Sequence, residues 1–93
     1  MVVGIVTVRI SLPESQSLKD KRRIIKSLKD RARNAMNVSV AEVGYQDKWQ
    51  ISEIAFATVG SAGDIVQKRL SEIDKFLRSD PRWVLLDINT ETL

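Results

Sequence analysis

The sequence contains no cysteine and no histidine among its 93 residues. Disulfides, thiolate nucleophiles, imidazole bases and Cys/His zinc sites are therefore excluded. Aromatic residues make up only 5% of the chain. The apolar stretch at residues 2–8 has no basic leader or cleavage site, and Arg9 ends it far short of membrane-spanning length. From these absences we expect a cytoplasmic protein with no metal site, no cofactor and no membrane contact.

The composition that is present is typical of a small globular protein. Hydrophobic residues account for 43% and charged residues for 29%, well away from the composition of disordered chains. A chain of this length does not hold enough apolar residues for two independent cores. We therefore predict one domain that covers residues 1–93.

Hydrophobic periodicity predicts four strands and two helices in the order β-α-β-β-α-β. A capping-box pattern at Ser17 to Asp20 predicts the start of the first helix. The predicted segments are 2–12, 18–35, 37–45, 51–59, 66–77 and 83–90. Right-handed crossover connections place both helices on one face of a four-stranded antiparallel sheet. The predicted architecture is the ferredoxin-like α+β fold.

The second face of such a sheet has no helix over it. Alternation along the first and last strands predicts that Ile5, Trp83 and Leu85 point to this open face. An apolar face that nothing covers needs a partner or a ligand. One functional hypothesis is therefore a homo-dimer or a larger oligomer that associates through this face as a structural or regulatory module, with no nucleic-acid binding.

The register of the central hairpin is ambiguous, because both faces of residues 51–59 carry apolar side chains. A two-residue turn at Asp47 and Lys48 would place Glu42 directly opposite Glu53. Like charges are unfavourable in that position. We expect a longer loop, or a bridging cation such as Arg9, rather than a divalent-cation site.

The first predicted helix is unusually basic. Residues 19–33 hold eight of the fifteen cations and only two acids, Asp20 and Asp30, so this segment carries +6 and the remainder −3. Several cations three and four residues apart share one face of a helix: Lys19, Arg22, Arg23, Lys26, Lys29 and Arg33. A polyanion gains affinity at such a face through counterion release. The sequence therefore predicts RNA binding there; the alternatives are an acidic protein partner and a solvated face.

The placement of aromatic residues limits how RNA would be read. Sheet-face readers of single-stranded RNA stack bases on aromatics of the two middle strands, where this sequence has only Phe56. We therefore expect recognition of the RNA backbone and shape. Trp49 and Trp83 are each interpreted either as a partner anchor or as a packed core or edge residue.

No arrangement of residues predicts catalysis. The first strand-to-helix loop, residues 13–16, contains Glu14 and no glycine, which is unsuited to cradling a phosphate. The second helix opens with Asp64, which also repels anions. We predict a protein that is not an enzyme, with no catalytic residues.

Three segments resemble the YlxP-like family of small bacterial proteins of unknown function. They are Ser17-Leu18-Lys19-Asp20-Lys21-Arg22-Arg23-Ile24-Ile25-Lys26-Ser27-Leu28, Asn37-Val38-Ser39-Val40-Ala41-Glu42 and Asp47-Lys48-Trp49-Gln50. The resemblance covers the whole chain. It implies a ferredoxin-like fold, a bacterial cytoplasmic protein and genes that neighbour translation and ribosome-maturation factors, and it implies no established reaction.

The family signature and the helical-face argument overlap only in part. Lys29 and Arg33 rest on the helical face alone, whereas the other predicted cations also lie within the signature. Lys21 belongs to the signature as well, but its position in the first turn points toward the core. For Lys21 two roles stay open: contact with RNA, and a structural role in which the stem is packed and the ammonium reaches an acidic group. The resulting hypothesis is an RNA- or ribosome-associated binding module.

Overall fold

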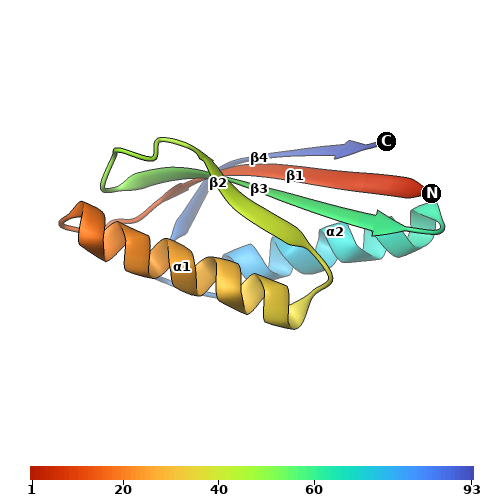
Figure 1. Cartoon of the computed structure of the whole chain (residues 1–93), viewed down its shortest axis with the longest axis horizontal. Helices are drawn as coiled ribbons and strands as arrows, with labels where there is room; N and C mark the ends of the chain where they lie inside the picture. Colours follow the sequence, from red (N-terminus) through yellow and green to blue (C-terminus); the bar gives the residue numbers. More distant parts are fainter.

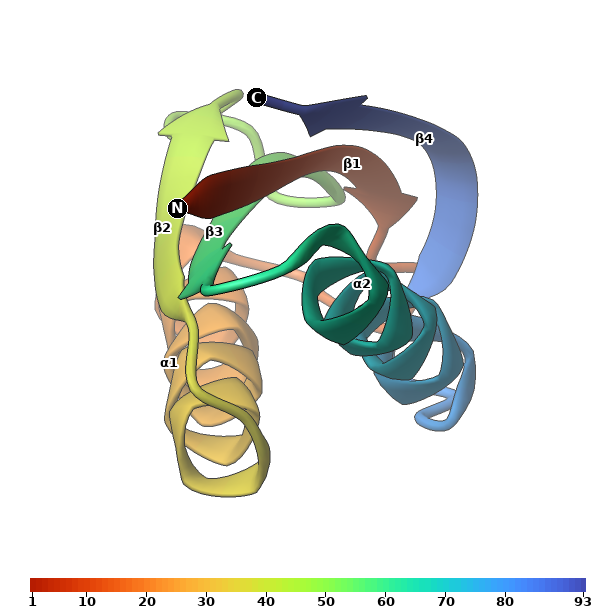
Figure 2. The same ribbon diagram turned by 90° about the vertical axis from the view of Figure 1, so that its right-hand side faces the viewer.

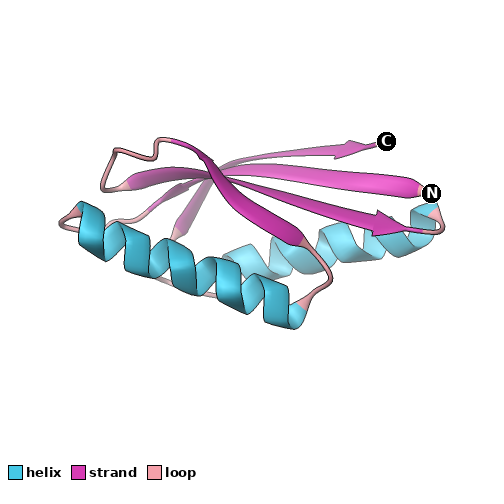
Figure 3. Cartoon of the chain, in the orientation of Figure 1, coloured by secondary structure: helices cyan, strands magenta, loops and turns pink.

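An antiparallel sheet forms the frame of the molecule in the computed structural model, which describes residues 1–93. Its strands, β1 (Val2–Ser11), β2 (Ser39–Gly44), β3 (Ile51–Gly60) and β4 (Val84–Thr92), lie in the order β2-β3-β1-β4. The helices α1 (Leu18–Ala35) and α2 (Gly63–Arg78) lie on the same side of this sheet (Figures 1 and 3). The predicted ferredoxin-like α+β fold is confirmed. Neither helix combines the length and the hydropathy that a membrane-spanning helix requires.

The core lies between the sheet and the two helices (Figure 2). Alternate residues of β1, among them Val6, Val8 and Ile10, are buried on this side, as the period of a strand requires. They meet apolar stripes of α1 and α2 in which buried residues recur every three or four positions. In Figure 2, α1 lies under β2 at one edge of the sheet, and α2 lies nearer to β1 and β4.

The start of α1 follows the predicted cap. The backbone N–H of Asp20 donates to the hydroxyl of Ser17 at 3.0 Å, and the Asp20 carboxylate accepts from the backbone N–H of Gln16 at 3.1 Å. These bonds satisfy donors that have no partner within the first turn of the helix. The predicted range of 18–35 is confirmed at both ends.

The hairpin between β2 and β3 has the longer loop that the charges predicted. Residues 45–50 connect the strands, and a register shift between Glu42 and Gly44 sets Glu42 opposite Ile54 and Gly44 opposite Glu53. Glu42 therefore lies on the helix side of the sheet and Glu53 on the open side. The cation that meets Glu42 is Lys21 rather than the suggested Arg9.

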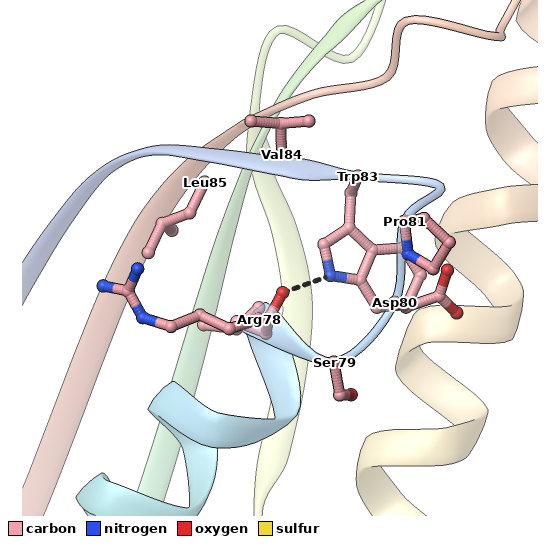
Figure 4. Close-up of a pocket in the computed structure, with 8 residues that line it drawn as sticks. Arg78, Ser79, Asp80, Pro81, Trp83, Val84 and Leu85 are labelled. Atoms are coloured by element: carbon pink, nitrogen blue, oxygen red, sulfur yellow. Dashed lines mark hydrogen bonds between the residues drawn. The ribbon is translucent and has the colours of Figure 1, made fainter.

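The prediction for Trp83 and Leu85 is wrong, because neither residue lies on the open face. Trp83 is 3% exposed, and its indole N–H donates to the carbonyl of Leu77 at 2.8 Å (Figure 4). Leu85 packs against the core on the helix side. The cause is a register shift in which Ile10 pairs with Leu85 and Arg9 with Asp87, leaving one extra residue in β4. Such a bulge reverses the faces predicted from simple alternation.

Candidate nucleic-acid interface

A groove runs between α1 and the edge strand β2. Its hollow has a volume of about 370 Å³, and its lining residues are Arg22, Ile25, Lys26, Lys29, Asp30, Arg33 and Glu42. Four of the seven carry a positive charge. We call this hollow the basic groove.

Helix geometry explains why these four cations share one groove. Arg22, Lys26, Lys29 and Arg33 follow one another at intervals of four, three and four residues, so they form one stripe along α1. The stripe lies beside the buried stripe rather than opposite it, which turns it toward β2. From Arg22 to Arg33 the stripe extends about 16 Å along the helix axis, long enough to follow several phosphates of a nucleic-acid strand.

Asp30 neutralises part of this charge. Its carboxylate accepts a hydrogen bond from Lys26 at 2.8 Å and lies 3.7 Å from the guanidinium of Arg33. The bond from Lys26 is the main cause that holds the pKa of Asp30 below its usual value. Arg22 and Lys29 make no ion pair at all. They are the two cations of the groove that no carboxylate neutralises.

The second acid of the groove, Glu42, is held by groups beneath it. Lys21 is 1% exposed and places its ammonium 3.0 Å from the Glu42 carboxylate, which also accepts from the Ser52 hydroxyl at 2.6 Å. The same ammonium donates to the carbonyl of Tyr45. Of the two roles left open for Lys21, the structural one is confirmed. Because Lys21 offsets the charge of Glu42, this acid contributes little repulsion toward an anion in the groove.

The remaining two predicted cations lie outside the basic groove. Lys19 is exposed and has no ion pair, and Arg23 lies 3.8 Å from Asp20 on the solvent side of the helix. The structure thus brings together four of the six predicted residues and separates Lys19 and Arg23 from them.

The other flank of α1 carries a charged cluster that sequence reasoning missed. Asp80, in the turn before β4, pairs with Arg31 of α1 and, at 2.8 Å, with Arg82, whose guanidinium also donates to Ser27 at 3.1 Å. These bonds, led by the one from Arg82, lower the pKa of Asp80 to about 2. The contact between Arg31 and Asp80 spans 49 positions, and nothing in the local pattern indicates it.

The open face of the sheet is apolar near its centre. A hollow of about 270 Å³ there is lined by Ile5, Ser39, Val40, Ala41, Ala55, Phe56 and Ala57. Ile5 therefore does lie on the predicted face. Toward one end Arg9 sits in register between Glu53 and Asp87 without forming an ion pair to either.

Carboxylates are scattered over the structure. No group of three or more acidic side chains lies close enough together to hold a metal ion. Glu42 and Glu53, which the sequence placed near each other, point to opposite faces of the sheet.

A further hollow lies at the end of α2. It has a volume of about 460 Å³ and is lined by Trp83, Arg78 and Asp80 among others (Figure 4). Arg78 there is paired with Asp74.

Comparisons with known proteins match nearly the whole chain. A family model described as "Protein of unknown function (DUF503)" matches residues 3–90. The uncharacterized protein YlxP of Bacillus subtilis (strain 168) is 34% identical over 80 residues, which are 86% of this chain and 87% of the relative. Among solved structures, the apo form of LarC2, the C-terminal domain of a cyclometallase involved in the synthesis of the NPN cofactor of lactate racemase, aligns with a TM-score of 0.48 at 6% identity. That alignment covers 100% of this chain and 55% of LarC2, so the chain spans about half of that structure's length.

Proposed function

The chain belongs to the DUF503 family of proteins of unknown function, and we propose that it is a non-catalytic cytoplasmic module that binds structured RNA through the basic groove. The resemblance to YlxP-like proteins predicted this membership. The gene neighbourhood that the resemblance implies, among translation and ribosome-maturation factors, favours ribosomal RNA as the partner.

One observation carries the proposal. Four cations of α1 line one hollow whose two carboxylates are already engaged, Asp30 by Lys26 and Glu42 by Lys21. Cations held close together repel one another, and an anion that spans them relieves this repulsion while it releases its own counterions. A chain of phosphates suits a stripe about 16 Å long better than a single small anion does.

The experiment measures binding of a fluorescent hairpin of ribosomal RNA over a series of salt concentrations. If the four groove cations contact phosphates, the plot of log affinity against log salt falls with a slope of about −3 to −4. The double variant Arg22→Gln/Lys29→Gln removes the two cations that have no ion pair. It should reduce the steepness of the slope by about 1.4 to 1.8.

A matched control is available on α2. Lys68 and Lys75 are exposed helix residues without an ion pair, so Lys68→Gln/Lys75→Gln removes the same charge from a different surface. The proposal requires the control to bind with nearly the wild-type slope. An equal loss in both variants, or no binding by the wild type at low salt, contradicts it.

A second candidate function rests on the open face. The apolar hollow around Ile5, Ala41 and Ala57 would be removed from water if a second copy, related by two-fold symmetry, packed against it. On this hypothesis the chain is a homo-oligomeric structural or regulatory module, and its basic helix is solvated.

Sedimentation at several protein concentrations tests the second candidate. A dimer through the open face should dissociate in the variant Ala57→Glu, which places a charge in the hollow, and should be insensitive to salt. The variant Arg22→Gln/Lys29→Gln should leave such a dimer intact. A wild type that sediments as a monomer at every concentration rules this candidate out.

A further inference from the structure

The loop between β2 and β3 carries two partly exposed aromatic rings. Trp49 is 53% exposed and Tyr45 is 41% exposed. The chain has only five aromatic residues, and the other three, Phe56, Phe76 and Trp83, are buried or pack against the core. The indole N–H of Trp49 donates to no protein atom, whereas that of Trp83 does. Large exposed rings of this kind are frequent where a partner binds.

The loop is tied to the start of α1. The Tyr45 carbonyl accepts from the Lys21 ammonium, and the Gln50 side-chain amide donates to the carbonyl of Ser15 at 3.0 Å. The backbone N–H of Leu12 donates to the Gln50 carbonyl at 2.9 Å. Both ends of the loop are therefore anchored, and it lies over the N-terminal end of α1 (Figure 1).

The backbone at Tyr45 shows how firmly the loop is held. Tyr45 has a φ of 57°, the only non-glycine residue with a positive φ. A bulky residue adopts this left-handed conformation rarely, and only where its surroundings impose it. Here the Tyr45 carbonyl accepts both from Lys21 and, at 3.1 Å, from the backbone N–H of Lys48. These hydrogen bonds hold the backbone of the loop that carries the two exposed rings.

The loop and the basic groove meet at Lys21. Its ammonium contacts Glu42, which lines the groove, and Tyr45, which begins the loop. A second hollow, of about 460 Å³, surrounds Trp49 and is lined by Asp47, Lys48, Gln50 and Ile51. This lining holds one acid and one cation, Asp47 and Lys48, so it has no net charge that would hold a phosphate, and the Trp49 ring offers a base an uncharged surface.

We propose that Trp49, held on the loop that begins at Tyr45, stacks on an unpaired base of the RNA whose phosphates lie in the basic groove. This inference rests on the proposed function and specifies its ligand as RNA in which a helix adjoins a bulge or loop. Every base has a face that stacks, and stacking on one aromatic side chain changes affinity by about 5- to 150-fold. The contact adds a preference for RNA shape without reading the sequence.

The test compares two RNAs, a blunt duplex and the same duplex interrupted by a short bulge. Wild type should bind the bulged RNA more tightly. Trp49→Ala should lose about 5- to 150-fold on the bulged RNA, with little change on the blunt duplex and an unchanged salt slope, and Trp49→Phe should recover part of the loss. Leu86→Ala, which trims an equally exposed apolar side chain on β4, is the matched control.

A fluorescence measurement gives a second readout. Because Trp83 is buried, iodide quenching reports Trp49, and bulged RNA should protect it while the blunt duplex should not. Equal affinity of Trp49→Ala and wild type for the bulged RNA, or equal losses on both RNAs, overturns the stacking proposal alone. If wild type binds neither RNA, or if Arg22→Gln/Lys29→Gln binds both as wild type does, the proposed function fails together with the stacking.

Discussion

The two flanks of helix α1 use cations in opposite ways. On one flank Arg22 and Lys29 face the basic groove without any ion pair. On the other flank Arg31 is bound to Asp80, which Arg82 holds from a second side. The two flanks belong to the same eighteen-residue helix and carry the same residue types.

The number of charges on a helix therefore does not reveal what each charge does. A cation that pairs with a buried carboxylate is neutralised within the fold and stabilises it. An unpaired cation is still able to attract a negatively charged ligand. Lys21 is the extreme case, because its ammonium is almost wholly buried between Glu42 and Tyr45. Substitutions on the two flanks therefore distinguish the cations that stabilise the fold from those that face the groove.

The largest expected effect is on stability when Lys21 is replaced. Lys21→Met leaves the half-buried Glu42 carboxylate without its cation and the Tyr45 carbonyl without its donor. We expect a loss of about 3 kcal/mol in the free energy of unfolding, measured in urea. The control Lys26→Met breaks an exposed pair of the same helix and should cost less than about 1 kcal/mol. Equal midpoints for the two variants would show that burial does not distinguish these lysines.

The next effect concerns the paired flank. Asp80→Asn removes the charge that joins Arg31 and Arg82, and we expect it to cost about 2 kcal/mol, because hydrogen bonds to charged groups are among the stronger ones. Asp74→Asn, which affects only the exposed pair with Arg78, serves as control and should change stability by less than about 1 kcal/mol. Thermal unfolding of both variants is the measurement. A melting temperature unchanged by Asp80→Asn would show that the cluster contributes nothing.

The lowered pKa of Asp80 predicts how the stability of the protein changes in acid. The pKa of Asp80 is lowered in the folded protein from 3.8 to about 2 by its bonds to Arg82 and Arg31. A lowered folded pKa adds stability that is fully present above 3.8 and disappears as the pH falls through about 2. The stability difference between wild type and Asp80→Asn should therefore be constant above about pH 5 and shrink progressively below it. A difference that stays constant down to pH 2 would place the contribution elsewhere.

Much of the fold was predictable because its signals are local. The range of α1 follows from the Ser17 cap and from the spacing of Ile25 and Leu28, and both signals lie within or next to the helix itself. The burial of Lys21 was predictable for the same reason, since its position falls on the apolar stripe. Local periodicity also placed Ile5 on the open face.

The residues that the sequence placed wrongly are those whose positions depend on contacts between distant segments of the chain. The bulge opposite Arg9 and Ile10 is a property of two strands together, so alternation within β4 could not place Leu85. Lys19 and Arg23 were grouped with the groove cations because the sequence does not say on which side of α1 the strand β2 lies. The Asp80 cluster joins α1 to the turn before β4, and Arg31 and Asp80 are 49 positions apart. The spacing of residues along the chain does not indicate such a contact.

A single substitution on each flank of α1 tests whether the two flanks have different roles. Lys29→Gln and Arg31→Gln each remove one charge, at positions two residues apart on opposite flanks of the same helix. The measurement is the salt dependence of binding to the ribosomal RNA hairpin. Our expectation is that Lys29→Gln reduces the steepness of the slope by about 0.7 to 0.9, while Arg31→Gln keeps the wild-type slope and lowers the melting temperature. Equal slopes for the two variants would contradict it.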